Sequence, residues 1–199
     1  MRKILFLDGN LSANEVSYSR NIMDAFYQYT LKNFDKDQVE RINLNDTKLS
    51  SIFLTQANFK TYFADVESDF WIDKLKEIDT LVISCSMTNF GPTVLVKNFI
   101  DSICVANKTF SYKYSTKGDA IGLLTNLNVI VVATQGAPRD WYPFGSHIEW
   151  LKGTFNFLGA KSVQTIEYCG TKVAPILGSN PKEISNTLVE QFSKINDLN

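Results

Sequence analysis

The segment Leu81-Val82-Ile83-Ser84-Cys85-Ser86-Met87-Thr88-Asn89-Phe90-Gly91-Pro92 decides the fold class of this chain. Its first half is nearly continuous in apolar and β-branched residues, as in a parallel strand that helices cover on both faces. The segment then becomes polar, and a helix is expected to begin near Thr93, just after Pro92. In open α/β sheets, ligands lie at the carboxyl ends of strands. The loop is therefore predicted to contact a ligand through Met87, Thr88, Asn89 and Phe90, with an ordinary strand-to-helix turn as the alternative.

Similar strand-like segments recur along the chain, at Lys3–Asp8, Gln38–Leu44, Thr80–Cys85, Asn128–Thr134 and Ser162–Tyr168. Helical patterns lie between most of them, and this alternation predicts a parallel sheet with helices on both faces. Five such strands fit a flavodoxin-like three-layer α/β sandwich with strand order 2-1-3-4-5. A dinucleotide-binding Rossmann unit is the alternative, but the G-x-G-x-x-G pattern after the first strand is missing. We expect residues 1–199 to form a single flavodoxin-like domain.

Three helices and one long connection can be placed from apolar spacing. The helices are expected at Ser19–Lys32, after Pro92 and at Pro181–Ile195, and Ser17 or Ser19 is well placed to cap the first one. The segment Asn107–Leu124 is longer than a typical connection, which indicates a functional or interface role.

Composition narrows the class of protein. The 199 residues carry a formal net charge of −1, without a run of Lys or Arg on one helix or loop, so neither nucleic acid nor a membrane surface is an expected partner. Asp8 ends the first apolar run far short of a signal peptide or a membrane span, and we expect a cytoplasmic protein. Cys85, Cys104 and Cys169 are widely spaced and form no C-x-x-C pair, so we expect neither disulfides nor a bound metal.

The loop after the first predicted strand, Gly9–Arg20, is small and polar and ends where a helix begins. The N-terminus of a helix attracts phosphate through its N–H groups and its dipole, and hydroxyl groups add further donors. Ser17, Tyr18 and Ser19 are therefore predicted to hold a phosphate. Simple capping of the helix is the alternative interpretation.

The loop after the fourth predicted strand contains a glycine that lets the backbone approach a ligand closely, within Thr134, Gln135, Gly136 and Ala137. In the predicted topology, the ends of strands one, three and four border the same crevice. Together the three loops predict a mononucleotide site. Since the P-loop pattern G-x-x-x-x-G-K-[ST] is absent, flavin mononucleotide (FMN) is favoured over a nucleoside triphosphate.

At these residues the chain resembles the FMN-dependent NADH-azoreductase family, whose members are also described as FMN-dependent NADH:quinone oxidoreductases. The likeness spans almost the whole chain. The family's S-x-S, M-Y-N-F, L-K-N, T-F-x-Y and S-T-F-L-G-F-x-G motifs are similar to Ser17–Ser19, Met87–Phe90, Val96–Asn98, Thr109–Tyr112 and Gly153–Gly159.

The resemblance implies a homodimer with one tightly bound FMN per subunit near the interface, and partner residues that help to cover the flavin. It implies that NADH gives a hydride to FMN and that quinones or aromatic azo compounds then take two electrons, in a ping-pong reaction. The flavin carries the chemistry, so no catalytic residue is expected from the protein. By resemblance, Phe110 and Phe157 are candidates for stacking on substrates, with core packing as the alternative.

The chain departs from the family pattern at several of these positions. Thr88 replaces a tyrosine, Thr134–Ala137 replaces S-R-G-G, and Asn10 stands where the family often has serine. Asn10 is still counted among the expected FMN contacts. At Thr88, Gln135 and Ala137 we expect contacts through the backbone rather than the side chain.

Two other functions compete with the oxidoreductase. A flavodoxin-like electron carrier would bind FMN without oxidising NADH itself, but carriers usually have a strongly acidic surface. A hydrolase acting on acyl carrier protein would need a nucleophile-base pair or a metal-ligand cluster, and neither is evident. His147, the only histidine, is a candidate proton donor, although a contact at a helix start or at the flavin edge is favoured.

Overall fold

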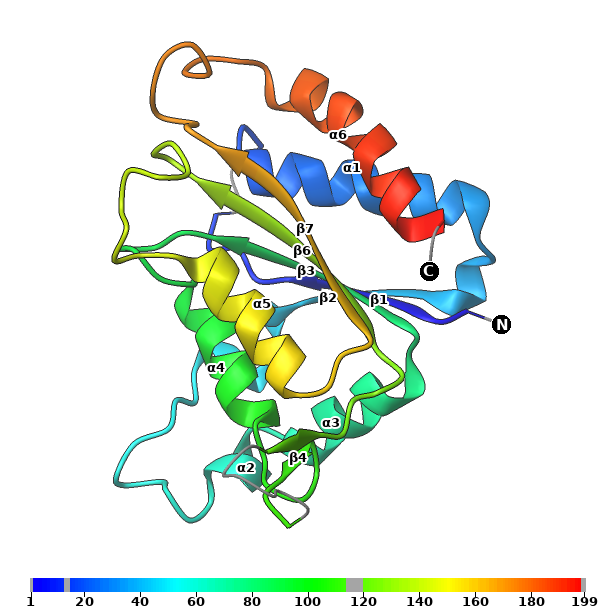
Figure 1. The fold of residues 1–199 in the computed structure, drawn as a ribbon, viewed down its shortest axis with the longest axis vertical. Helices are drawn as coiled ribbons and strands as arrows, with labels where there is room; N and C mark the ends of the chain where they lie inside the picture. The colour runs from blue at the N-terminus through cyan, green and yellow to red at the C-terminus, as the bar shows by residue number, and fades with distance from the viewer. Residues whose placement is uncertain (1, 13–14, 114–119, 198–199) are drawn as a thin grey trace.

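The computed structural model describes residues 2–12, 15–113 and 120–197 (Figure 1). Its main sheet contains five parallel strands in the order β2-β1-β3-β6-β7, namely β1 (Ile4–Asp8), β2 (Val39–Asn43), β3 (Thr80–Ser86), β6 (Asn128–Gln135) and β7 (Ser162–Cys169). Because β6 and β7 are the fourth and fifth strands of this sheet, the order is the predicted 2-1-3-4-5. The flavodoxin-like fold class is confirmed.

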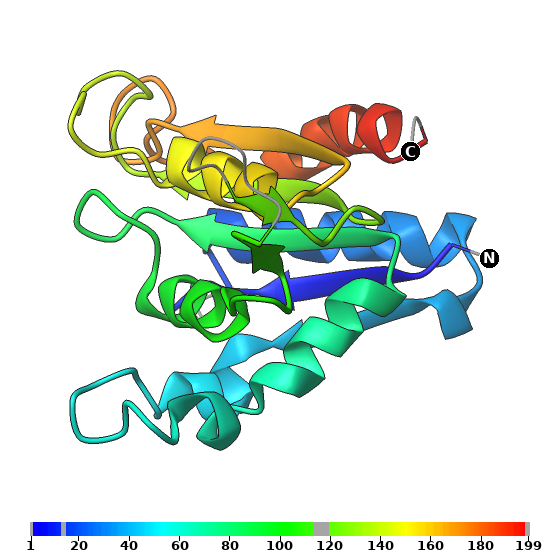
Figure 2. The same ribbon diagram turned by 60° about the horizontal axis from the view of Figure 1, so that its bottom comes forward.

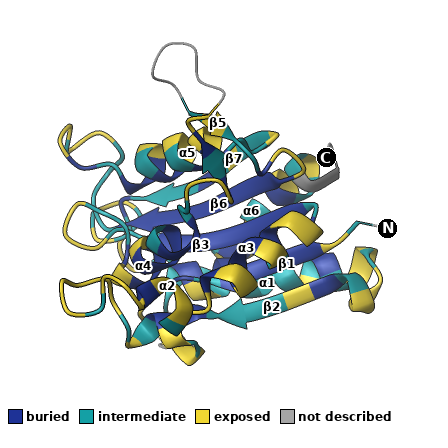
Figure 3. Cartoon of the chain, turned by 90° about the horizontal axis from the view of Figure 1, so that it is seen from below, coloured by how far each residue is buried: buried dark blue, intermediate teal, exposed yellow. Residues whose placement is uncertain are grey.

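The burial of each strand follows its place in the sheet. All eight residues of β6 are buried and six of the seven in β3, whereas the edge strands β2 and β7 are mostly half-buried. Figure 3 shows this gradient from the central strands to the edges. A strand that is covered on both faces has no reason to alternate between apolar and polar residues. This is why residues 81–85, in β3, are nearly continuous in apolar and β-branched residues.

The helices form two layers, one on each face of the sheet (Figure 1). α1 (Tyr18–Asn33) and α6 (Pro181–Asp197) cover one face, and α3 (Ser68–Glu77), α4 (Val94–Ile103) and α5 (His147–Phe157) cover the other. A short helix, α2 (Tyr62–Asp65), precedes α3, and single 3₁₀ turns lie at Lys36–Gln38, Leu44–Asp46 and Lys48–Ser50.

Alternate residues of each strand point into two separate cores. On the α1/α6 face, the buried side chains include Phe6, Val82, Ile130, Phe26 and Phe192. On the other face, they include Leu7, Ile83, Val131, Phe99 and Phe155. The period of two along a strand therefore divides the apolar residues between the two layers of helices.

The segment Asn107–Leu124 forms a small antiparallel ribbon of β4 (Phe110–Ser111) and β5 (Ile121–Gly122), and residues 114–119 lie outside the described residues. Gly122 packs directly on the end of α5, since a Cβ atom added there would lie 2.1 Å from the backbone nitrogen of Gly159. The ribbon is thereby fixed to the end of α5. Within the described ranges, no helix has the length and apolar composition needed to cross a membrane.

Candidate functional site

The strands of the sheet are parallel, so the loops that follow β1, β3, β6 and β7 all lie at its carboxyl edge. Figure 2 shows the loops after β3, β6 and β7 extending from this edge. The four loops surround a pocket with a volume of about 450 Å³, which is within the range of roughly 300–1,000 Å³ typical of small-molecule sites. Seven of the predicted FMN contacts line it: Ser17, Tyr18, Ser19, Met87, Thr134, Gln135 and Gly136. The remaining lining residues are Ser12, Val16, Ser86, Thr171 and Lys172.

The serine loop differs from an ordinary helix cap. Ser17 occupies the N-cap position of α1 with an extended backbone, but its side chain makes no capping hydrogen bond. Its Oγ lies 3.1 Å from the Oγ of Ser19, and both residues line the pocket. One hydrogen bond between two hydroxyl groups uses only one of their protons, so the other proton is available to a ligand. The first turn of α1 contains no acidic residue, which preserves the positive end of the helix dipole.

The loop after β3 is a tight two-residue turn. The backbones of Thr88 and Gly91 exchange two hydrogen bonds, with N···O distances of 2.9 and 3.1 Å. Asn89 and Phe90, the two residues between them, have φ angles of 46° and 73°. Positive φ at both positions matches the turn type of short β-hairpins, but it is uncommon for a residue as large as phenylalanine. Such strain, on the order of 1–3 kcal/mol per residue, is concentrated at functional sites.

Phe90 belongs to an aromatic cluster beside this turn. Its ring centroid lies 5.0 Å from that of Tyr142 and 5.0 Å from that of Phe144, both in edge-to-face arrangements. Gly145 makes the approach possible, because a Cβ atom there would lie 2.6 Å from the Cβ of Phe90. Phe144 is 75% exposed, so the cluster presents an aromatic surface to solvent. The roles of Tyr142 and Phe144 were not predicted from the sequence.

Arg139 fixes the loop between β6 and α5 that carries this cluster. Its guanidinium group donates to Glu167 of β7 at 2.6 Å and to Glu149 of α5 at 2.7 Å, and a third hydrogen bond of 3.5 Å reaches the Oγ of Ser146. Ser146 in turn caps α5, since its Oγ accepts from the backbone N–H of Glu149 at 3.2 Å. One side chain therefore joins the loop to the strand and the helix on either side.

The loop after β7 contributes Thr171 and Lys172 to the pocket, and neither residue was predicted from the sequence. The backbone N–H of Gly170 donates to Gln135 and Ala137, and that of Lys172 donates to Gly136 at 2.9 Å. These bonds join two loops about 35 residues apart. Topology is the signal that could have identified these residues, because a loop after a parallel strand always lies at the carboxyl edge.

The side chain of Gln135 is used within its own loop, since its Nε2 donates to the carbonyl oxygens of Ala137 and Pro138 at 3.0 and 2.8 Å. The predicted backbone contacts of Gln135 and Ala137 with a ligand remain predictions, because the carbonyl oxygens of both residues already accept hydrogen bonds from the protein. Thr88, Asn89, Phe90 and Ala137 do not line the pocket themselves. They adjoin lining residues in the chain, so their predicted contacts remain predictions.

Asn10 lies on the other side of the first loop. It lines a hollow of about 590 Å³ between β1, α1 and the end of β2, which adjoins the pocket at Ser12. Its side chain is buried, and its Nδ2 donates to the Oγ of Ser84 at 2.8 Å, while Oδ1 has no partner within the described residues. In this structure Asn10 joins the ends of β1 and β3, and its predicted FMN contact remains a prediction.

Phe110 and Phe157 lie together, with ring centroids 5.1 Å apart, but at the far end of α5 from the pocket. Neither residue lines the pocket of its own chain.

The L-K-N motif has a structural role at Asn98. Its Nδ2 donates to the backbone oxygens of Leu49 and Ile52, and its Oδ1 accepts from the hydroxyl of Tyr62 at 2.6 Å.

His147 is the first residue of α5 and is completely buried. Burial lowers its pKa to about 4; the nearby backbone of Cys85 opposes this shift in part, and the Arg139 cation adds to it. The imidazole is therefore neutral at pH 7, and neither ring nitrogen has a hydrogen-bond partner within the described ranges. Burial also raises the pKa of the Cys85 thiol to about 12, as expected for an inert cysteine.

The sheet order and the pocket at its carboxyl edge define a flavodoxin-like α/β protein. Residues 2–191 match the family model described as flavodoxin-like fold. The FMN-dependent NADH:quinone oxidoreductase of Mycoplasmopsis synoviae (strain 53) is 54% identical over 192 residues, which cover 96% of this chain and 94% of that relative. The chain therefore belongs to the flavodoxin-like family and, within it, to the FMN-dependent NADH:quinone oxidoreductases.

Solved structures agree with this fold. The azoreductase from Bacillus anthracis str. Sterne superimposes with a TM-score of 0.81 at 18% identity, covering 100% of both chains. The FMN-dependent NADH-azoreductase from Bacillus anthracis str. Ames Ancestor, solved in complex with FMN, gives a TM-score of 0.74 at 23% identity and covers 99% of both chains.

Proposed function

We propose that this protein is an FMN-dependent oxidoreductase that takes a hydride from NADH. It passes two electrons to quinones and reductively cleaves aromatic azo compounds, in a ping-pong reaction. The observation that carries the proposal is the pocket in which three separately predicted loops meet. The names of the relatives, FMN-dependent NADH:quinone oxidoreductase and azoreductase, support the same reaction.

The residues of the pocket suit FMN. Ser17, Ser19 and the N-terminus of α1 offer uncharged donors to a phosphate group, and none of the described lining residues is a carboxylate that would repel it. The loops Met87–Phe90 and Thr134–Ala137 offer backbone groups to a flat ring system. When bound, FMN supplies the hydride chemistry, and the protein binds it, orients it and limits access of water.

The aromatic cluster of Phe90, Tyr142 and Phe144 gives planar substrates a surface next to these loops. Quinones, azo compounds and the nicotinamide ring are all flat and stack on aromatic rings. His147, which is neutral and buried behind the loops, suits a packing role better than that of a proton donor.

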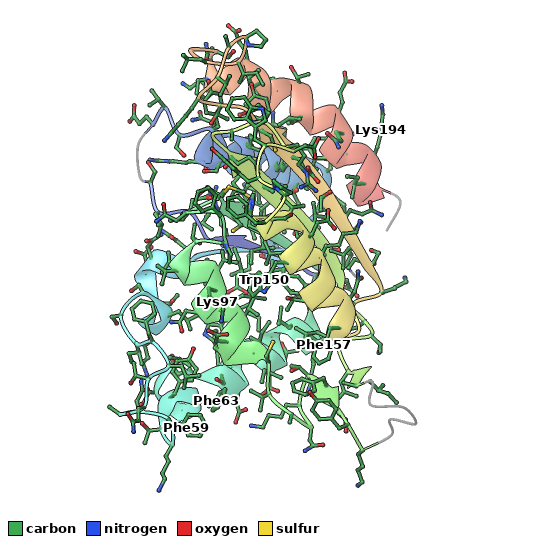
Figure 4. The ribbon with its side chains drawn as sticks, turned by 60° about the vertical axis from the view of Figure 1, so that its left-hand side comes forward. Phe59, Phe63, Lys97, Trp150, Phe157 and Lys194 are labelled. Carbon is green, nitrogen blue, oxygen red and sulfur yellow. The ribbon has the colours of Figure 1, made fainter. Side chains whose placement is uncertain are left out.

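We also propose a cytoplasmic homodimer. The three cysteines are free thiols, as is usual in a reducing compartment. A groove of about 550 Å³ lies between α4 and α5, and Figure 4 labels Lys97, Trp150 and Phe157 along it. Phe157 is 41% exposed and Val94, on α4, is 48% exposed, so this face offers apolar area to a second copy. Phe110 and Phe157 lie far from their own pocket, so they would contact a substrate only at the site of the partner subunit.

The decisive experiment is anaerobic reduction by NADH followed by reoxidation with benzoquinone. We expect the purified protein to bind FMN, NADH to bleach the visible absorbance of the flavin, and benzoquinone to restore it. Absence of FMN binding would disprove the oxidoreductase. FMN binding without reduction by NADH would instead support the electron carrier.

A further inference from the structure

Among the described residues that line the pocket at the carboxyl edge, Lys172 is the only charged one. It follows β7 by three positions, and no carboxylate forms an ion pair with it in the part of the chain that the structure describes. Lys172 is exposed and solvated in the free protein, and its positive charge at the pocket attracts an anionic group of a ligand.

The anchoring of Lys172 indicates which part of the ligand it faces. Its backbone N–H donates to the carbonyl oxygen of Gly136 at 2.9 Å. Its aliphatic stem runs along the same glycine, since a Cβ atom on Gly136 would lie 3.0 Å from Cδ and 3.2 Å from Cγ of Lys172. Lys172 is therefore attached to the loop that is predicted to hold the flavin ring.

The phosphate group already has donors of its own in Ser17, Ser19 and the N-terminus of α1. The pyrimidine part of the flavin ring has a different requirement, because its charge changes during the reaction. Hydride transfer from NADH adds two electrons and one proton to the ring system, which gains one negative charge while NADH leaves as NAD⁺. Positive charge near N1 of a flavin stabilises the reduced form.

We propose that Lys172 is a cation that contacts the pyrimidine edge of bound FMN and selectively stabilises its reduced, anionic form. This inference rests on the proposed function, because it takes FMN to be the ligand of the pocket. Lys172 thereby sets the reduction potential of the flavin, and with it the range of acceptors that the enzyme reduces.

The test compares the wild type with Lys172→Met and Lys172→Arg. Dissociation constants are measured for oxidised FMN, for FMN reduced with dithionite, and for riboflavin, which lacks the phosphate. Lys161→Met is the matched control, since Lys161 is an exposed lysine at the opposite end of β7. Dithionite makes the measurement independent of NADH oxidation.

We expect Lys172→Met to weaken binding of reduced FMN about tenfold more than binding of oxidised FMN. For a two-electron couple, this difference corresponds to a potential about 30 mV more negative. Lys172→Arg is expected to retain the wild-type ratio, and Lys161→Met is expected to change nothing.

Three results would overturn the inference. Equal weakening of oxidised and reduced FMN, with riboflavin unaffected, would assign Lys172 to the phosphate. Unchanged constants in Lys172→Met would make it a solvated surface residue, and in both cases the proposed oxidoreductase would stand. Failure of the wild type to bind FMN would overturn the inference and the proposed function together. Binding of FMN without reduction by NADH would affect only the proposed function.

Discussion

At the scale of single residues, the pocket contains a serine hydroxyl group that is not used to cap its helix. Ser17 holds the cap position of α1 without a capping bond, whereas Thr93 and Ser146 cap α4 and α5 with their side chains. Thr93 Oγ1 accepts from the N–H of Val96 at 3.2 Å, which is the usual work of a cap residue. The contrast between Ser17 and these caps favours a ligand role for the serine loop.

Replacing both Ser17 and Ser19 by alanine is expected to weaken FMN binding about 100-fold, because two hydrogen bonds to a charged phosphate are lost, at about 3 kcal/mol in total. Fluorescence titration with FMN measures the change. Riboflavin is the control ligand, and its affinity is expected to stay constant. Unchanged FMN affinity in the folded double variant would show that the phosphate lies elsewhere.

His147 is expected to make the protein less stable in mild acid. In the folded state burial lowers its pKa from 6.5 to about 4, so between these values the unfolded chain binds a proton that the folded chain does not. Stability due to this group is therefore complete above pH 6.5 and decreases as the pH falls toward 4. Between pH 7 and pH 5 the loss is about 2 kcal/mol.

His147→Leu is the matched variant, since it places a side chain of similar size at the same buried position but has no group that titrates. Urea unfolding at pH 7 and pH 5 gives the free energy of unfolding of both proteins. The wild type is expected to lose about 2 kcal/mol more than the variant over this range. Equal losses would mean that His147 is not buried in the neutral form.

At the scale of elements, the loop between β6 and α5 is held by Arg139 rather than by regular secondary structure. This guanidinium group connects the loop to β7 and to α5, and the aromatic cluster depends on the resulting position of Tyr142 and Phe144. Arg139 is partly exposed, so we expect its loss to affect the order of the loop more than global stability.

Arg139→Met is expected to raise amide hydrogen exchange in residues 136–146 about tenfold, because the loop opens more often once its links are gone. Exchange in β3 and β6 is expected to stay slow. Lys152→Met, on the exposed side of α5, is the control. If amide exchange in this loop is the same in Arg139→Met as in the wild type, backbone contacts alone hold the loop in place.

At the scale of the whole molecule, the exposed apolar residues are unevenly distributed. Phe157 and Val94 lie on the α4/α5 side, and Phe59, which Figure 4 also labels, is 67% exposed in the long connection between β2 and α2. The opposite face, formed by α1 and α6, has Lys32 and Lys182 beside its shallow hollow. The apolar side is therefore the better candidate for a subunit interface.

Phe157→Glu is expected to convert the proposed homodimer to monomers, because a carboxylate would be buried in an apolar contact. Sedimentation equilibrium measures the mass in solution. Gln28→Glu adds the same charge on α1, on the opposite face, and is expected to leave the dimer intact. A wild type that sediments as a monomer would contradict the homodimer itself.

The sequence predicts the positions of the strands well, but it does not predict which side chains from distant segments come into contact. β3 and β6 were located within one residue because complete burial requires continuous apolar sequence, and the order of the strands follows from the alternation of strands and helices. Tyr142, Phe144 and Lys172 had no comparable signal. Their roles come from contacts with Phe90 and Gly136, which lie about 35 to 55 residues away in the chain.

The sequence by itself determined the fold class, the three loops that meet at the carboxyl edge and the family resemblance, because each depends on local pattern and on the fixed geometry of parallel sheets. Only the tertiary structure decided that Ser17 is not used as a side-chain cap, that Asn10 faces a different hollow and that Phe110 and Phe157 lie far from the pocket of their own chain. It also brought Lys172 into the pocket. These features depend on contacts between side chains that are far apart in the sequence, and such contacts are set only by the packing of the folded chain.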